Sequence, residues 1–227
     1  MENWWLLILV MYGGSALAAY LLGCFNGAVI VSKYILRDDV RNHGSGNAGL
    51  TNFYRTFGGP LTALVILTDV LKAVFALLLG VWVFGWLPGG GPALFGHHID
   101  GVLFGKYWAG LFCLLGHMFP CMFKFKGGKG ILSGGTIAIM IDWRIALVVW
   151  GGFLLLTVLT RYVSLGSLWA GASFPFATWV CYPDPVIVIL GFLCGGLVVW
   201  QHQANIKRLL SGTESKFSFR HKKEGGL

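Results

Sequence analysis

The chain has 227 residues, of which 56% are hydrophobic and 11% are charged, and its formal net charge is +8. This composition excludes an ordinary water-soluble globular protein, in which about a quarter of the residues are charged. The 34 glycines and 10 tryptophans fit a membrane protein, because glycine is common in membrane helices and tryptophan collects at the lipid–water interface. We therefore expect most of the chain to lie in lipid.

Apolar runs long enough to form a spanning helix, which needs roughly 20 residues, follow one another along the sequence. They cover residues 4–31, 60–87, 102–122, 131–160, 163–181 and 185–200. The fourth run carries Asp142, Trp143 and Arg144 near its middle, so we expect it to turn there and to cross the membrane twice. The sequence thus predicts an all-α integral membrane protein with seven transmembrane helices.

The basic residues gather in four places between these runs. They are Lys33, Arg37, Arg41 and Arg55; Lys124, Lys126 and Lys129; Arg161; and Lys207, Arg208, Lys216, Arg220, Lys222 and Lys223. Because Lys and Arg are retained on the cytoplasmic side, we expect all four clusters there, with the N-terminus outside and the C-terminus cytoplasmic. An odd number of crossings satisfies this arrangement.

The same charges bear on domains and partners. The first basic residue is Lys33, so the N-terminal run lacks the basic segment of a signal peptide and reads as a retained helix. We expect a polytopic membrane catalytic domain over 1–214 and a basic cytoplasmic tail over 215–227. Since topology explains the positive charge, we expect no nucleic-acid partner. The scattered cysteines have no metal-ligand spacing, and we expect neither a metal nor a cofactor.

The first basic loop is rich in small and hydrogen-bonding residues. It contains Gly44, Ser45, Gly46, Asn47, Thr51, Asn52 and Arg55. Glycines let backbone N–H groups approach an anion, and a guanidinium binds phosphate through two hydrogen bonds. A simple glycine-rich turn is the alternative. The concentration of Ser, Asn, Thr and Arg in an otherwise apolar chain favours an anion-binding loop.

A second loop carries two lysines around paired glycines. It reads Lys126, Gly127, Gly128, Lys129 and Gly130, and it follows His117 and Pro120. The lysines could be cytoplasmic anchors, but anchors do not need these glycines, so we favour another anion cradle at the end of a helix. His117 lies in apolar surroundings, and we expect a hydrogen-bonded helix residue there and not a base.

Further polar residues follow the last span or lie at membrane depth. His202 and Asn205 are three residues apart and share a helix face, with Glu214 beyond them; an interfacial amphipathic helix is the alternative. Ser164 follows Arg161 at the expected start of a helix, where a hydroxyl can serve as a cap. Asp69 and Lys72 fall inside the second span, where a structural salt bridge and a catalytic role are equally plausible.

Taken together and in this order, these motifs resemble those of PlsY, the bacterial glycerol-3-phosphate acyltransferase family that uses acyl phosphate. The resemblance runs from the first span to about Glu214 and implies an enzyme of the bacterial inner membrane. Such an enzyme moves an acyl group from acyl phosphate to the first hydroxyl of glycerol 3-phosphate, giving lysophosphatidic acid and phosphate. It also implies that the enzyme works as a monomer among membrane lipids.

The resemblance also implies roles for individual residues. The catalytic set is Ser45, Arg55, Lys129, His202 and Asn205. The substrate-binding set is Gly44, Gly46, Asn47, Thr51, Asn52, Lys126, Gly127, Gly128, Gly130 and Ser164. We ourselves assign structural roles to Asp69, Lys72 and Glu214. Either the substrate phosphate or His202 is the base.

The sequence departs from the family pattern in its third motif, and one alternative function stays open. Gln201 and Gln203 stand beside His202 where the family usually has arginines, so the third motif carries less positive charge here. A transporter of a phosphorylated or anionic small molecule is the alternative function, and it predicts internal repeats with polar groups near the middle of the membrane.

Overall fold

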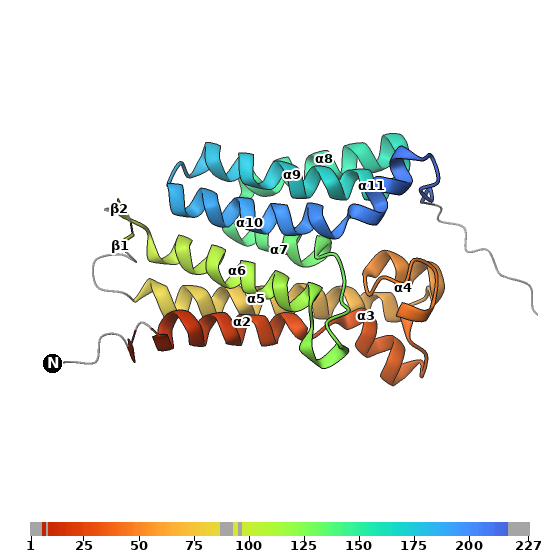
Figure 1. Ribbon diagram of the computed structural model, residues 1–227, viewed down its shortest axis with the longest axis horizontal. Helices are drawn as coiled ribbons and strands as arrows, with labels where there is room; N and C mark the ends of the chain where they lie inside the picture. The colour runs from red at the N-terminus through yellow and green to blue at the C-terminus, as the bar shows by residue number, and fades with distance from the viewer. Residues whose placement is uncertain (1–5, 8, 87–92, 95–96, 218–227) are drawn as a thin grey trace, which may run out of the picture.

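The computed structural model describes residues 6–7, 9–86, 93–94 and 97–217. Within these residues the protein is a bundle of helices running along one long axis (Figure 1). Residues 4–5, 8 and 87 of the expected spans, and 218–227 of the expected tail, lie outside the described residues. The expectation of an all-helical architecture holds, apart from a two-stranded antiparallel ribbon of Ala93–Leu94 (β1) and His97–His98 (β2).

The long helices are α2 (Ser15–Cys24), α5 (Leu61–Gly85), α6 (Gly101–Met118), α7 (Ile131–Ile141), α8 (Trp143–Thr160), α9 (Val163–Cys181) and α10 (Pro185–Gln201). Shorter helices are α3 (Gly27–Ile30), α4 (Leu50–Thr56) and α11 (Gln203–Leu210). Short helical segments between or beside these are η1 (Leu9–Gly14), η2 (Val31–Ile35), η3 (Val40–Asn42) and η4 (Cys121–Phe123). Helix α6 contacts α2, α5, α7 and α10 and so lies at the centre of the bundle.

Three helices of the described chain are long and apolar enough to cross a membrane, or five if each of two bent pairs is one span. The three are α5, α8 and the run Gly101–Phe123 that begins with α6, while α7 is shorter. Seven crossings and the sidedness of the chain therefore remain predictions.

The expected turn in the fourth apolar run is present at Asp142, between α7 and α8. The Asp142 carboxylate accepts a hydrogen bond from the backbone N–H of Arg144 at 2.7 Å and also pairs with its guanidinium at 2.8 Å. A carboxylate that caps the start of a helix satisfies an otherwise unpaired N–H group. This capping ends one apolar helix and begins the next.

The first run bends by 43° between Leu9–Cys24 and Gly27–Ile35, a feature that its apolar pattern does not predict. The side chain of Asn26 caps α3 by accepting from Val29 N at 3.1 Å, and its amide donates to the carbonyl of Ala48 at 3.0 Å. A buried amide whose hydrogen bonds are satisfied in this way fixes the bend. The bend carries the chain over to the first polar loop.

Helices α5 and α6 approach each other closely through glycines. A Cβ atom on Gly80 would collide with the carbonyl of Gly105, and the reverse also holds. Small residues at such crossings let helices pack tightly where no water is present to drive association. The tight crossing fixes α6 in the centre of the bundle.

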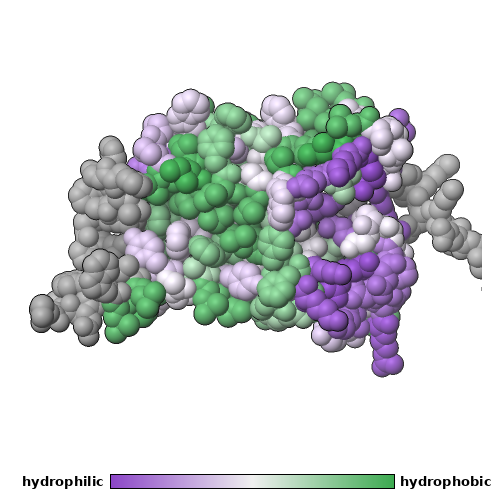
Figure 2. Space-filling model, in the orientation of Figure 1, coloured by the Kyte–Doolittle hydropathy of each residue, from purple (hydrophilic) through white to green (hydrophobic). Residues whose placement is uncertain are grey.

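Polar and apolar residues separate along the bundle. Figure 2 shows hydrophilic surface gathered at the end that holds α3, α4 and α11, and hydrophobic surface over the helices between the two ends. Leu147, Leu154 and Val158 on α8 are exposed, as expected for a helix that faces lipid. The polar end therefore marks one membrane surface.

Candidate active site

The three polar loops meet around one cavity of about 1410 Å³ at this polar end. Its walls include the predicted site residues Gly44, Ser45, Asn47, Thr51, Asn52, Arg55, Lys129, Gly130, Ser164, His202, Asn205 and Glu214. Residues far apart in the sequence are thus brought together as the motifs suggested. The start of α7 also reaches the cavity through Ile131 and Leu132, and free N–H groups at a helix start favour anions.

Gly46, Lys126, Gly127 and Gly128 are not among the residues that line the cavity. Gly127 N donates to Met118 O at 3.1 Å and Gly128 N to His117 O at 3.1 Å. The last carbonyls of a helix need such donors, so the loop closes the end of α6. These two N–H groups are therefore used within the protein, and the anion cradle remains a prediction for Lys129 and Gly130, which line the cavity.

Lys126 also departs from the expectation. Its side chain is exposed, and its carbonyl oxygen accepts from Arg41 Nη1 at 3.3 Å. Arg41 also donates to Phe123 O at 2.8 Å and is paired with Asp39 at 2.7 Å. Arg41, which the sequence analysis treated only as a topology signal, therefore ties the first loop to the second.

Asn52 shapes the first loop. Its buried amide donates to Val40 O and His43 O, both at 3.0 Å, and its side-chain oxygen accepts from Ser45 N at 3.0 Å. Gly44 has a φ of +54° and a Cβ there would collide with Asn52 Oδ1, so only glycine fits comfortably. The polar atoms of Asn52 thus all bond to the backbone of the first loop. These bonds set the shape of the loop and hold Ser45 at the cavity.

A chain of polar contacts joins the second and third motifs. Lys129 Nζ donates to Asn205 Oδ1, and Asn205 Nδ2 donates to Glu214 Oε1 at 2.9 Å. The other oxygen of Glu214 accepts from Arg208 Nε at 2.6 Å. Glu214 therefore fixes Asn205, and Asn205 in turn aims the ammonium of Lys129.

The charges of this chain influence one another. Burial, reinforced by the positive charge of Arg208, lowers the pKa of Lys129 to about 8, although the charge of Glu214 opposes the change. Burial alone would raise the pKa of Glu214, but hydrogen bonds from Arg208 and Asn205 outweigh it and leave that pKa below its ordinary value. An excess of buried positive charge favours a bound anion.

His202 lies just beyond α10, is 2% exposed and lines the cavity. Its Nδ1 is 2.7 Å from the carbonyl oxygen of Val198, which can only accept, so Nδ1 carries the proton. Burial, reinforced by the charge of Lys129, lowers the pKa of His202 to about 4 although the bond to Val198 opposes this. His202 is therefore neutral near pH 7, and its Nε2 is a hydrogen-bond acceptor.

The start of α9 differs from the expected serine cap. The residue before the helix is Tyr162, whose N–H donates to Thr160 Oγ1 at 3.1 Å, and no side chain caps α9 itself. Ser164 lies inside the helix, with its buried hydroxyl at the cavity wall beside Glu214. Ser164 is thus placed to face a ligand and not to begin the helix.

The expected pairing of Asp69 with Lys72 is present, with Lys72 Nζ 2.7 Å from Asp69 Oδ1. His117 is hydrogen-bonded, as expected, through Nδ1 to the same ammonium at 2.6 Å. These side chains lie under the cavity floor, to which Asp69 and His117 contribute.

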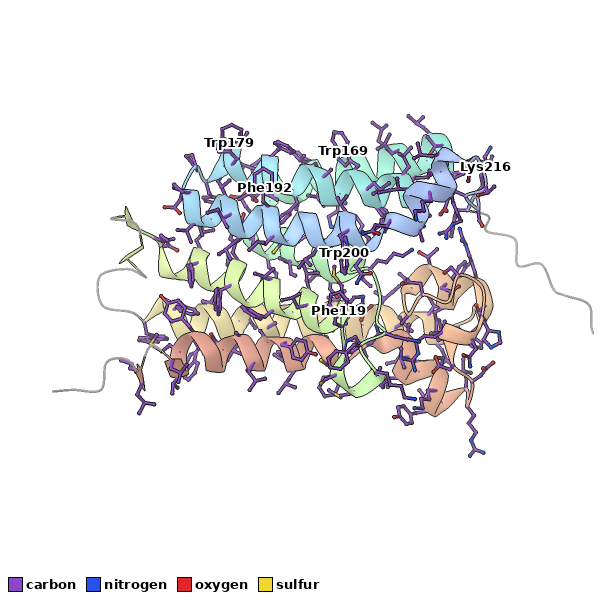
Figure 3. The ribbon with its side chains drawn as sticks, viewed as in Figure 1. Phe119, Trp169, Trp179, Phe192, Trp200 and Lys216 are labelled. Carbon is purple, nitrogen blue, oxygen red and sulfur yellow. The ribbon has the colours of Figure 1, made fainter. Side chains whose placement is uncertain are left out.

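A narrow apolar groove adjoins the cavity. Its lining includes Leu114, Gly134, Gly135 and Phe174, and it shares Gly130 and Ile131 with the cavity. Phe119 and Trp200 lie next to each other between α6 and α10, with ring centroids 5.7 Å apart (Figure 3). The groove itself is small, about 30 Å³, and an apolar groove beside a polar cavity suits a ligand with an anionic head and an apolar group next to it.

The sequence matches the family model described as glycerol-3-phosphate acyltransferase over residues 14–212. A glycerol-3-phosphate acyltransferase of Thermoanaerobacter pseudethanolicus is 37% identical, over 89% of this chain and 93% of that protein. A glycerol-3-phosphate acyltransferase of Clostridioides difficile is 40% identical, over 88% of this chain and 93% of that protein.

The fold matches a crystal structure of PlsY, an integral membrane glycerol 3-phosphate acyltransferase, in its glycerol 3-phosphate form. The TM-score is 0.77 and the identity 31%, covering 91% of this chain and 96% of that one. The chain belongs to the glycerol-3-phosphate acyltransferase family.

Proposed function

We propose that this protein transfers an acyl group from acyl phosphate to the first hydroxyl of glycerol 3-phosphate, giving lysophosphatidic acid and phosphate for phospholipid synthesis. The observation that carries this proposal is the continuity between the cationic cavity and the apolar groove, which share Gly130 and Ile131. Both substrates carry a phosphate, and one also carries a hydrocarbon chain. The site offers a place for each part.

The phosphates would be held by cationic side chains and by the start of α7. Arg55 and Lys129 line the cavity and supply positive charge, while Ser45, Thr51 and Ser164 supply hydroxyl donors. The acyl chain would leave the cavity along the apolar groove, so that the carbonyl carbon lies where groove and cavity meet. Holding both substrates in this way supplies much of the rate increase, because acyl phosphate is already activated.

The reaction would need no protein nucleophile. The glycerol 3-phosphate hydroxyl attacks the carbonyl carbon, the carbonyl oxygen takes the negative charge, and phosphate then leaves with the electron pair of the broken bond. His202, with a pKa of about 4, is a weak base near neutral pH. We therefore assign proton removal from the attacking hydroxyl to a substrate phosphate, while His202 Nε2 accepts a hydrogen bond from the other hydroxyl of glycerol 3-phosphate and Asn205 orients Lys129.

We also propose the membrane arrangement that the sequence indicates: a monomer in the bacterial inner membrane with seven crossings, the N-terminus outside and the cavity cytoplasmic. The catalytic domain would extend to Glu214. Beyond it, Ser215 and Lys216 line the cavity and Phe217 N donates to Arg161 O at 2.7 Å, so the tail begins against the cavity mouth (Figure 3). A transporter is less favoured, since the cavity lies at the polar end and not near the middle of the bundle.

The donor assignment is tested with purified protein in lipid, supplied with glycerol 3-phosphate and either acyl phosphate or acyl-coenzyme A. We expect lysophosphatidic acid from acyl phosphate alone, without added metal. Product from acyl-coenzyme A and none from acyl phosphate would overturn the donor.

The matched variants Arg55→Ala and Lys33→Ala test the site itself. Lys33 is an exposed cation outside the cavity, so its loss controls for a change in overall charge. We expect kcat/KM to fall by about 100-fold for Arg55→Ala, the scale of a lost transition-state donor, and to change little for Lys33→Ala. Equal activity in both variants would reject the cavity as the site of catalysis.

A further inference from the structure

Three buried ionisable side chains meet beneath the cavity floor. Asp69 is 1% exposed, Lys72 4% and His117 3%. The Lys72 ammonium donates to Asp69 Oδ1 at 2.7 Å, to His117 Nδ1 at 2.6 Å and to the carbonyl of Phe25 at 3.1 Å. An ammonium has three donors, so every N–H of Lys72 is used.

These contacts fix the tautomer of His117. An ammonium has donors only, so Nδ1 of His117 must accept and carries no proton. In a neutral imidazole the proton then lies on Nε2. Asp69 compensates the charge of Lys72 in this buried ion pair. His117 is thus held as an Nε2–H donor, the opposite tautomer to that of His202.

The surroundings of His117 indicate which groups its Nε2–H donor can reach. His117 lines the cavity, and within the described part of the chain its Nε2 makes no hydrogen bond, in contrast to its Nδ1. Gly128 lies against the ring, because a Cβ there would collide with Nε2. Leu114, one helical turn earlier on α6, lines the apolar groove. Leu114 also lies against Gly130, which lines both the groove and the cavity, so His117 lines the cavity one helical turn from the point where they meet.

We propose that His117 is a further catalytic residue whose Nε2–H donates to the carbonyl oxygen of the acyl donor, with Lys72 as its positioning residue. The inference rests on the proposed function, which places the carbonyl carbon at this junction. As the hydroxyl attacks, the carbonyl oxygen gains negative charge, and the fixed donor stabilises it until phosphate leaves and the C=O bond reforms. A donor aimed in advance loses little energy to reorganisation.

Two substitutions separate this role from a structural one. In His117→Asn the amide oxygen takes the place of Nδ1 and keeps the acceptor for Lys72, but the donor toward the cavity is lost. In His117→Gln the longer side chain returns an amide donor to the place of Nε2. In His117→Asn we expect kcat to fall by about 100-fold or more, the scale for one such donor, while KM for glycerol 3-phosphate stays nearly unchanged. In His117→Gln we expect part of the lost kcat to return.

Turnover near the wild-type value in His117→Asn would overturn the inference, as would a rise in KM with unchanged kcat. Wild-type protein inactive with acyl phosphate would instead reject the proposed function, which keeps the two failures distinguishable. Histidine nitrogen NMR spectra of the full-length wild-type protein give a test that needs no active variant. We expect the Nε2–H tautomer for His117 and the Nδ1–H tautomer for His202, and an Nδ1–H tautomer at His117 would refute the proposal.

Discussion

His202 donates its Nδ1–H to the carbonyl oxygen of Val198 at 2.7 Å. The bond leaves Nε2 of the neutral ring as an acceptor that faces the cavity, and it holds the ring plane in place. Because burial keeps the pKa of His202 at about 4, the ring orients a hydroxyl better than it removes a proton near neutral pH. This relationship distinguishes orientation from general-base catalysis.

The first prediction therefore concerns His202→Gln, which keeps an acceptor near Nε2 but cannot act as a base. We expect His202→Gln to retain activity within about 10-fold, and His202→Ala to lose about 100-fold, the range attributed to one positioned catalytic group. Steady-state kinetics of both variants provide the measurement. If Gln and Ala were equally inactive, His202 would be the base.

The second prediction concerns pH and Lys129. Its lowered pKa, about 8, means that the free enzyme loses this positive charge as the pH rises through that value. Since an uncharged lysine binds phosphate poorly, we expect kcat/KM for glycerol 3-phosphate to fall above about pH 8, with kcat less affected because bound phosphate raises the pKa. In Lys129→Arg the charge persists, so the alkaline decline should move upward. An unchanged decline would show that another group causes it.

The third prediction concerns the support of Asn205 by Glu214. In Glu214→Gln only the amide oxygen can accept a hydrogen bond, so the side chain cannot accept from both Asn205 and Arg208. Asn205 should then lose its fixed orientation, and the Lys129 ammonium should no longer be held toward the cavity. We expect KM for glycerol 3-phosphate to rise by about 10-fold, equivalent to about 1.4 kcal/mol. Lys207→Gln is the matched control, because Lys207 is exposed and outside the cavity. The same KM in both variants would contradict the proposed support.

The fourth prediction concerns the acyl groove at Gly134. A Cβ there would make only an ordinary contact, 3.7 Å from Leu114 Cδ2, so Gly134→Ala should fold and stabilise α7 slightly. The longer side chain of Gly134→Leu should fill the groove and shift preference from long-chain to short-chain acyl phosphates. Relative kcat/KM for a chain-length series measures the shift. Unchanged preference in Gly134→Leu would place the acyl chain elsewhere.

Several features of the fold followed from local sequence patterns. The break at Asp142 was predictable because an acidic residue interrupts an apolar run and can cap the next helix. The bend at Asn26 was not, since one amide within a long apolar run gives little signal and its partner Ala48 is distant in the sequence. Local patterns mark helix ends, while bends depend on tertiary contacts.

The candidate site also has features that the local sequence predicts and features that depend on tertiary contacts. Clusters of glycine, hydroxyl and basic residues indicated which loops matter, and the cavity brings them together. The glycines at 127 and 128 have a composition that suits either phosphate binding or closure of a helix end, and only the chain path reveals closure of α6. The neighbours of His117 and Lys129 come from other helices, so no spacing rule could identify them.

The most direct test of the account is the initial rate of lysophosphatidic acid formation with acyl phosphate and glycerol 3-phosphate both varied. If one cavity holds both substrates together and no acyl-enzyme forms, double-reciprocal plots should intersect, and phosphate and lysophosphatidic acid should appear in equal amounts. Parallel plots, with phosphate released from acyl phosphate before glycerol 3-phosphate is added, would reveal a covalent acyl-enzyme and contradict the account.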